Sequence, residues 1–170
     1  MVAERYDAGV RLGEQVAKDM IAVRIGPDFR QAVVGTPAYF KPRGRPQTPH
    51  DLSEHTCIGL RLPASGGLYT WPFAKGGREL KVRVDGQFVF NTITMMLNMS
   101  LAGLGLAHVP EDLARIHIAE GRLVRVLSEW CSPISGYHLY YPSRRQPTPA
   151  FVLLVEAMRY RDRLRATSKS

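Results

Sequence analysis

The side chains best suited to chemistry at neutral pH are five histidines and two cysteines, in a chain of 170 residues. His50, His55 and Cys57 lie close together, but a structural metal site needs four ligands and no second pair follows nearby. Cys131 and His138 lack the orienting partner that a nucleophile and its base require. The sequence therefore predicts no metal site, no cofactor and no enzyme active site.

Short motifs that mark common catalytic sites are missing from the sequence as well. It contains no G-x-S-x-G, no G-x-x-x-x-G-K and no H-E-x-x-H. Gly103-Leu104-Gly105 resembles part of a dinucleotide-binding loop, but it follows a predicted helix instead of leading into one. A bound pyrophosphate would meet no helix N-terminus there, so helix termination explains these glycines better.

His108 is the one polar side chain in an apolar run that precedes Pro110. Two interpretations stay open. In the first, His108 is a core histidine with satisfied hydrogen bonds; in the second, it lines a ligand cleft and changes its charge near neutral pH.

The stretch from Gly86 to Pro110 predicts how such residues are positioned. A β-rich run at 87–90 leads to Asn91 as the predicted N-cap, and the helix that follows ends at Gly103, which predicts a left-handed C-cap. An apolar strand at 104–109 completes a β-α-β unit, which is typical of parallel sheets covered on both faces. The apolar stripe of the helix consists of Ile93, Met96, Leu97 and Leu101.

Thr36 and Pro37 predict a second helix start, with threonine as N-cap and proline at the first helical position. The free N–H groups of such a terminus favour an anion above Thr36. We expect this helix to end near Lys41, before Pro42, and residues 42–52 to form a surface connection. Helices are also expected at 111–119 and 149–164, and strands at 8–11, 20–25, 32–34, 56–60, 68–73, 80–84, 123–127 and 137–141.

The net charge of +8 raises the question of nucleic-acid binding. The 23 basic residues are dispersed along the chain, and a binding patch needs charges that converge on one face, so a solvated surface is the preferred interpretation. No apolar run is long enough to span a membrane, and no signal peptide is visible. These features, with two cysteines expected to stay reduced and structural, predict a soluble, cytoplasmic protein.

Several segments occur in an order that resembles the effector-binding domain of LysR-type transcriptional regulators over nearly the whole chain. They are YDAGVRLGE (6–14), DMIAVRIGP (19–27), VVGTPAYF (33–40), GRPQTPHDLSEHTCIGLR (44–61), the Trp71-Pro72-Phe73 element, AGLGLAHVP (102–110), EGRLVRVL (120–127) and YHLYYPSRRQPTPAFVLLVEAMR (137–159).

The resemblance implies an α/β fold of the type II periplasmic-binding-protein kind, with two lobes, mixed sheets and helices on both faces. Lobe one is expected to comprise residues 1–34, incomplete at the N-terminus, and a return segment at 109–165. Lobe two is expected at 35–108, followed at the end of the chain by a disordered tail at 166–170. The hinge is expected at Val34, Gly35, Val109 and Pro110.

The resemblance also implies a small anionic or aromatic effector between the lobes. Together with the helix-terminus argument, it points to Arg11, Thr36, Pro37, Asn91 and His108 as ligand-binding residues. Family members carry a helix-turn-helix and a linker helix first, so DNA binding is expected only through such a part, and homo-oligomers only in the full-length protein. The alternative is a transport-type solute-binding protein, which shares the fold but needs an export signal.

Overall fold

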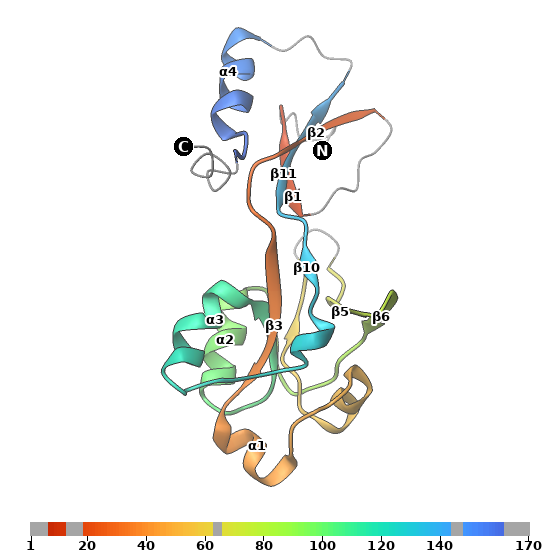
Figure 1. Ribbon diagram of the computed structural model, residues 1–170, viewed down its shortest axis with the longest axis vertical. Helices are drawn as coiled ribbons and strands as arrows, with labels where there is room; N and C mark the ends of the chain where they lie inside the picture. The colour runs from red at the N-terminus through yellow and green to blue at the C-terminus, as the bar shows by residue number, and fades with distance from the viewer. Residues whose placement is uncertain (1–6, 13–18, 63–65, 144–147, 162–170) are drawn as a thin grey trace, which may run out of the picture. The chain divides into compact units, whose positions relative to one another are not determined.

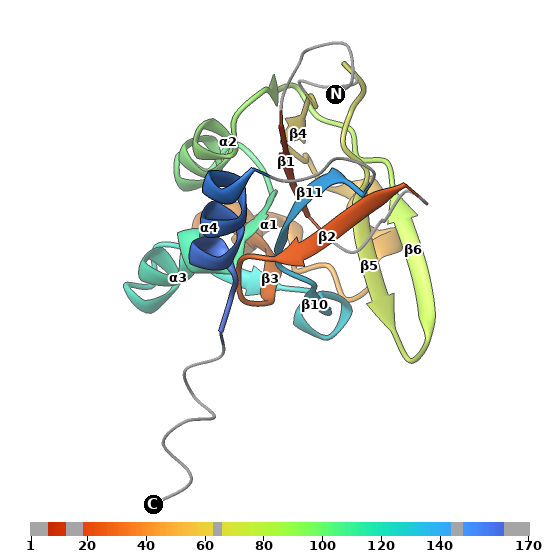
Figure 2. The same cartoon turned by 90° about the horizontal axis from the view of Figure 1, so that it is seen from above.

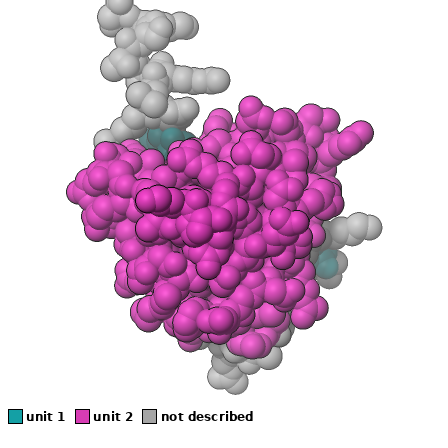
Figure 3. All heavy atoms as spheres, turned by 90° about the horizontal axis from the view of Figure 1, so that it is seen from below, with its two compact units in different colours: residues 1–29, 134–170 teal, residues 30–133 magenta. Residues whose placement is uncertain are grey.

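The computed structural model describes residues 7–12, 19–62, 66–143 and 148–161. The chain divides into two compact units, which Figure 3 colours separately. Unit 2 is continuous and spans residues 30–133, whereas unit 1 combines residues 1–29 with residues 134–170. The chain therefore passes between the units twice, within strand β3 (Phe29–Gly35) and within strand β10 (Pro133–Ile134). The predicted tail at 166–170 lies outside the described residues.

Strand β3 is the centre of the main sheet of unit 2. Strands β8 (Ala107–Pro110) and β9 (Val124–Val126) pair with it in antiparallel register, and β10 joins the same sheet. Its small and β-branched residues Ala32, Val33 and Val34 are fully buried, as expected for a strand covered on both faces.

Helices cover one side of β3 and a hairpin lies on the other (Figures 1 and 2). The helices are α2 (Ile93–Leu101) and α3 (Glu111–Ala119), and the hairpin consists of β5 (Trp71–Lys75) and β6 (Arg78–Val82). Gly76 and Gly77 have φ values of 58° and 78°, so the hairpin turn needs the conformational freedom of glycine at both positions. Both strands are shifted from the expected ranges 68–73 and 80–84.

The predicted β-α-β unit is present in a modified form. Strand β7 (Val89–Phe90) pairs in parallel with β4 (Gly59–Leu60), and the segment before β4 forms a parallel bridge between Cys57 and Leu106, just ahead of β8. Residues 56–60 thus lie between the two strands that α2 connects, and these strands are not direct neighbours.

The N-cap of α2 is Thr92, not Asn91 as predicted. Both residue types suit this position, but the helix begins one residue later because the Met96 N–H bonds to the Thr92 carbonyl at 3.4 Å. At the other end, Gly103 has a φ of 77°, which confirms the predicted left-handed conformation.

Helix α1 (Pro37–Arg43) begins as predicted, because the Thr36 hydroxyl accepts a hydrogen bond from the Tyr39 N–H at 3.2 Å. It continues past Lys41 and includes Pro42. The last turn closes without a bond from the proline, since the Gly44 N–H reaches the Phe40 carbonyl at 2.8 Å.

The segment expected to be only a surface connection contains a 3₁₀ helix, η2 (Pro49–Glu54). A capping box starts it: the Thr48 N–H and hydroxyl each donate to the Asp51 carboxylate at 2.9 Å. These hydrogen bonds lower the pKa of Asp51. The expectation was wrong because proline at the first helical position was taken only as a loop signal.

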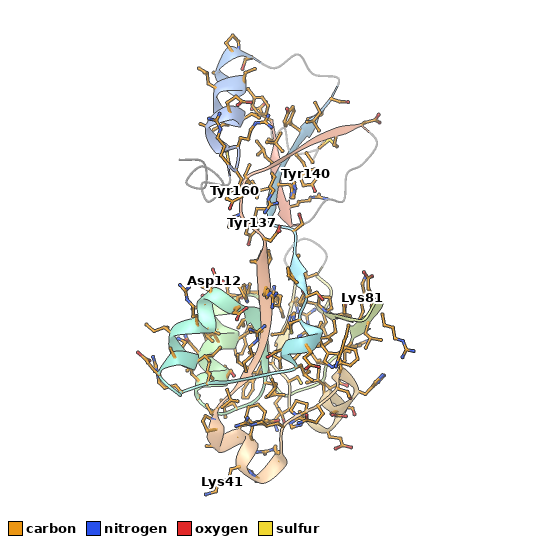
Figure 4. All side chains as sticks on the ribbon, viewed as in Figure 1. Lys41, Lys81, Asp112, Tyr137, Tyr140 and Tyr160 are labelled. Carbon is orange, nitrogen blue, oxygen red and sulfur yellow. The ribbon has the colours of Figure 1, made fainter. Side chains whose placement is uncertain are left out.

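The described residues of unit 1 form a three-stranded antiparallel sheet and one helix. The order is β1 (Gly9–Leu12), β11 (Tyr137–Pro142), β2 (Met20–Arg24), and the helix α4 (Pro149–Met158) packs on it through Val155. Three tyrosines of this unit are labelled in Figure 4. The helix ends well before residue 164, the end expected from the sequence, and its Leu154 is 49% exposed.

The division into units differs from the expected lobe boundaries. Residues 109–133 stay within unit 2 because β9 returns to pair with β3. The four expected hinge residues, Val34, Gly35, Val109 and Pro110, consequently lie inside the sheet of unit 2, whereas the chain passes between the units near residues 29–30 and 133–134.

Candidate functional site

His108 lies on β8 opposite Val33 of β3, and its side chain is only 3% exposed. Paired residues of an antiparallel ladder point to the same face, so His108 faces the hairpin side of the sheet together with Val33. The residues on the other face, including Ala32 and Val34, pack against α2 and α3. The fold therefore places one histidine in the apolar layer between the sheet and the hairpin.

Three aromatic rings surround the imidazole of His108. The Trp71 ring stacks on it, with centroids 5.2 Å apart and planes 21° apart, and the Tyr69 ring lies at 6.1 Å with a 30° tilt. The Phe73 ring approaches edge-on at 5.7 Å. Two of these residues belong to β5, so the hairpin provides most of the aromatic surface.

Four polar atoms of this layer lack hydrogen-bond partners in the described part of the protein. Seven buried side-chain nitrogen or oxygen atoms of the described residues are unpartnered, and four of them are His108 Nδ1 and Nε2, Trp71 Nε1 and Gln31 Oε1. Gln31 pairs with Pro110, so it lies on the same face as His108 and diagonal to it. Each unsatisfied buried group costs about 1–3 kcal/mol, so four on one face represent a substantial cost to folding.

Burial lowers the pKa of His108 from 6.5 to about 3. The imidazole is therefore neutral at pH 7, with one nitrogen as donor and the other as acceptor. Trp71 Nε1 adds a donor and Gln31 Oε1 adds an acceptor. The four atoms, which we call the His108 site, thus offer two donors and two acceptors.

The other predicted ligand residues of unit 2 are not part of this site. The Thr36 hydroxyl is already used to cap α1, with Pro37 behind it at the first helical position. Asn91 is exposed and precedes the true N-cap. A Cβ on Gly103 would lie 3.4 Å from the Thr36 hydroxyl, so Thr36 sits beside the end of α2.

Arg11 belongs to unit 1, where it is exposed on β1 opposite His138 of β11. His138 is itself buried, and its Nδ1 lies 2.9 Å from the Gly136 carbonyl. The structure therefore does not bring Arg11 and His108 into one unit, and it leaves a joint role for them as a prediction.

Sequence reasoning missed Gln31, Tyr69 and the role of Trp71. The signal that singled out His108, a polar residue within an apolar strand, also applies to Gln31, which precedes Ala32-Val33-Val34. It was overlooked because the strand was expected to begin at Ala32. Trp71 and Tyr69 gave no such signal, since aromatic residues are common in buried strands.

The remaining reactive side chains have other roles. Cys57 and Cys131 are free and buried, and burial raises the pKa of Cys57 to about 12, which disfavours the thiolate. Tyr39 packs against His55 and accepts a hydrogen bond from the Thr56 N–H at 2.9 Å. Within the described part of the chain, no group of three or more potential ligands could hold a metal ion.

A surface hollow of about 360 Å³ lies beside η2, and its lining includes His50, His55, Arg83 and Asp85. Lys41, Lys81 and Asp112 extend from different elements of unit 2 in Figure 4, which agrees with the dispersed charge expected from the sequence. No helix of the described residues is long and apolar enough to cross a membrane.

Comparison with known proteins identifies the family. The LysR substrate binding domain family matches residues 1–163. A protein of Pseudomonas aeruginosa is 55% identical over 160 residues, which cover 94% of this chain and 52% of that protein. The HTH-type transcriptional regulator PgrR of Escherichia coli is 45% identical, over 95% of this chain and 54% of PgrR. The chain thus spans about half the length of the curated relatives it matches.

Solved structures agree on the fold. The regulatory domain of a C227S variant of AphB from Vibrio vulnificus superposes with a TM-score of 0.72 over 91% of this chain and 75% of that one, at 24% identity. CrgA of Neisseria meningitidis, a LysR-type transcriptional regulator, gives a TM-score of 0.65 over 92% of this chain and 54% of that one, at 23% identity.

These structures and the two α/β units define a type II periplasmic-binding-protein fold. The chain belongs to the LysR substrate-binding domain family, and its named relatives include HTH-type transcriptional regulators. The named relatives are regulators of transcription, which does not favour the transport-type alternative.

Proposed function

We propose that this domain senses a small effector held between its two units, and that the effector sets the activity of a DNA-bound transcriptional regulator. The observation that carries effector binding is the His108 site within unit 2, with four buried polar atoms that lack partners. Buried polar groups are normally hydrogen-bonded, and an unexplained group points to an unseen partner or to function. A bound effector would supply the missing partners.

The position of the site supports a link to conformational change. Gln31 lies next to Arg30, the first residue of unit 2, on the strand by which the chain passes between the units. An effector that bonds to Gln31 would favour one backbone arrangement of β3. It would thereby shift the population of unit arrangements, which is how ligands act on a two-state protein.

Arg11 is proposed as the contact for an anionic group of the effector. Guanidinium groups form charge-assisted, bidentate hydrogen bonds with carboxylates, and Arg11 is exposed in unit 1. Thr36 and Asn91 are kept as proposed secondary contacts through backbone N–H groups near the starts of α1 and α2. Pro37 is kept as a lining residue beside Thr36, because it has no N–H to donate.

A calorimetric titration with a panel of small aliphatic and aromatic carboxylates tests this function. We expect at least one compound to bind the wild-type chain and to bind the Arg11→Ala variant at least tenfold more weakly. Arg78→Ala is the matched control, because it removes one positive charge from an exposed position of the hairpin. Equal binding by wild type and Arg11→Ala would remove Arg11 from the site, and no binding by any compound would contradict effector sensing.

DNA binding and assembly are proposed for the full-length protein. PgrR is named an HTH-type regulator, and this chain matches about half of it. We infer that DNA is bound by a helix-turn-helix outside these 170 residues and that the full-length protein is a homo-oligomer. A gel shift with this chain alone is expected to show no salt-sensitive DNA binding, and tight salt-sensitive binding would contradict the proposal.

A further inference from the structure

We propose that the His108 site accepts a flat, uncharged group that carries both a hydrogen-bond donor and an acceptor, such as a carboxamide or a lactam on an aromatic ring. This inference rests on the proposed function and specifies which part of an effector enters unit 2. It concerns His108, Trp71 and Gln31, and it assigns no anionic group to them.

The preference for a flat group follows from the ring geometry. Hydrogen bonds to imidazole nitrogens lie in the plane of the ring, so a partner of His108 extends that plane. The plane is within 21° of the Trp71 ring and within 30° of the Tyr69 ring. A planar group bonded to His108 would therefore stack along the same aromatic surfaces, in the offset arrangement that such rings favour.

The requirement for both a donor and an acceptor follows from the four atoms themselves. A neutral imidazole offers one N–H and one lone pair, the Trp71 indole offers only an N–H, and Gln31 Oε1 offers only lone pairs. A ligand with an acceptor alone would leave Gln31 and one imidazole nitrogen without a partner. A carboxamide presents a C=O and an N–H side by side in one plane, so it complements both kinds of atom.

The exclusion of charge follows from burial. His108 is 3% exposed and Trp71 is 0% exposed, and apolar side chains from β3, β5 and β9 surround them. An ionised carboxylate in such a layer needs a cation as partner, and burial holds His108 neutral at pH 7. The site therefore discriminates against an anion, which makes it complementary to the anion contact proposed for Arg11.

The test uses tryptophan fluorescence with matched probes. The chain has two tryptophans, so the Trp130→Phe variant leaves Trp71 as the sole reporter. Benzamide and benzoate are titrated into this variant at pH 7.5 and into the same variant with His108→Leu. We expect saturable quenching by benzamide, at least fivefold weaker binding of benzoate, and at least fivefold weaker binding of benzamide after His108→Leu.

Two further variants separate recognition from folding. His108→Gln keeps a donor and an acceptor at the position, so it should retain part of the benzamide affinity that His108→Leu loses. His138→Leu replaces a buried histidine of unit 1 whose Nδ1 already has a neighbour at Gly136, so it should leave benzamide binding unchanged.

The outcomes distinguish this inference from the proposed function. Benzoate binding that equals or exceeds benzamide binding and is insensitive to His108→Leu would overturn the inference while leaving an anion-sensing domain intact. Absence of saturable binding by both probes would overturn the inference as well. The proposed function would then be tested separately, by the calorimetric titration of carboxylates into the wild type and the Arg11→Ala variant.

Discussion

The two faces of the β3–β8 strand pair differ in how their polar atoms are satisfied. On the helix side, the fully buried Ser100 of α2 donates a hydrogen bond to the Val34 carbonyl at 3.1 Å, and the other strand residues are apolar. On the hairpin side, His108, Trp71 and Gln31 leave four atoms without partners. Both faces are packed cores, and the hairpin side differs in the four unpartnered atoms on which the proposed binding site rests.

Proteins tolerate such a cost mainly where function requires it. We propose that the unsatisfied groups of the hairpin side are retained because they bind a ligand. The contrast predicts that substitutions on the helix side change stability, whereas substitutions on the hairpin side change binding more than stability. The predictions below test this contrast in order of expected effect.

The largest effect is expected for Met96→Ala on the helix side. Met96 is fully buried between α2 and the sheet, and large-to-small substitutions of this kind cost about 2–5 kcal/mol. Urea unfolding followed by circular dichroism measures the change. Met95→Ala is the matched control, because Met95 is 39% exposed on the same helix, and it should cost far less. Equal losses for the two variants would mean that the helix side is not a packed core.

The second effect is the pH dependence of the stability that His108 contributes on the hairpin side. The pKa of His108 is about 3 in the folded chain and ordinarily 6.5, so below pH 6.5 the unfolded chain binds the additional proton. The contribution of His108 to the free energy of unfolding is then constant above pH 6.5 and falls toward pH 3. At pH 5 the loss is about 2 kcal/mol, from about 1.4 kcal/mol per pH unit.

Urea unfolding of the wild type and of His108→Leu at pH 7.5 and pH 5.0 measures this loss. The variant lacks the titrating group, so the difference between the two proteins isolates His108 from every other titration. Identical losses of stability in both proteins between pH 7.5 and pH 5.0 would show that His108 is solvated or already partnered.

The third effect is an unchanged or increased stability, where the first two effects are losses. At pH 7.5, His108→Leu should leave stability unchanged or raise it by about 1–2 kcal/mol, because it removes two unsatisfied buried nitrogens and keeps a similar volume. The measurement is again the midpoint of urea unfolding. A loss of more than about 1 kcal/mol would indicate that the nitrogens are hydrogen-bonded in the unliganded protein, and the contrast between the two faces would fail.

The smallest effect is expected for Ser100→Ala. The substitution removes a satisfied hydrogen bond to the Val34 carbonyl and should cost about 1 kcal/mol, without altering benzamide affinity. Thermal unfolding and the fluorescence titration test the two parts separately. If Ser100→Ala changed benzamide affinity but not stability, the helix side would also take part in ligand binding, which would contradict the contrast.

Local signals in the sequence predicted the elements of the helix side well. Helix α3 has its predicted bounds, because acidic residues begin it and Gly121 follows its end with a φ of 71°. The pairing of strands that are distant in the sequence was harder to predict. Residues 56–60 enter between β7 and β8, and no local pattern shows which strands are neighbours.

The candidate site was predicted in part. His108 was found because a polar residue interrupts an apolar strand, but the sequence left open whether its nitrogens would be satisfied. That depends on what the hairpin contributes from residues 69–73, which lie more than thirty residues earlier in the chain. Gln31 was missed because pairing with Pro110 extends β3 beyond its apolar run. Asn91 and Thr92 are both good N-caps, and only the hydrogen-bond register of α2 distinguishes them.

The central claim is that a ligand supplies hydrogen-bond partners to the His108 site. Nitrogen-15 NMR of the five histidine side chains, with and without benzamide, tests it most directly. The account predicts that the pair of imidazole resonances absent from His108→Leu shifts on titration while the ring stays neutral at pH 7.5. Shifts confined to histidine resonances that persist in His108→Leu would contradict it.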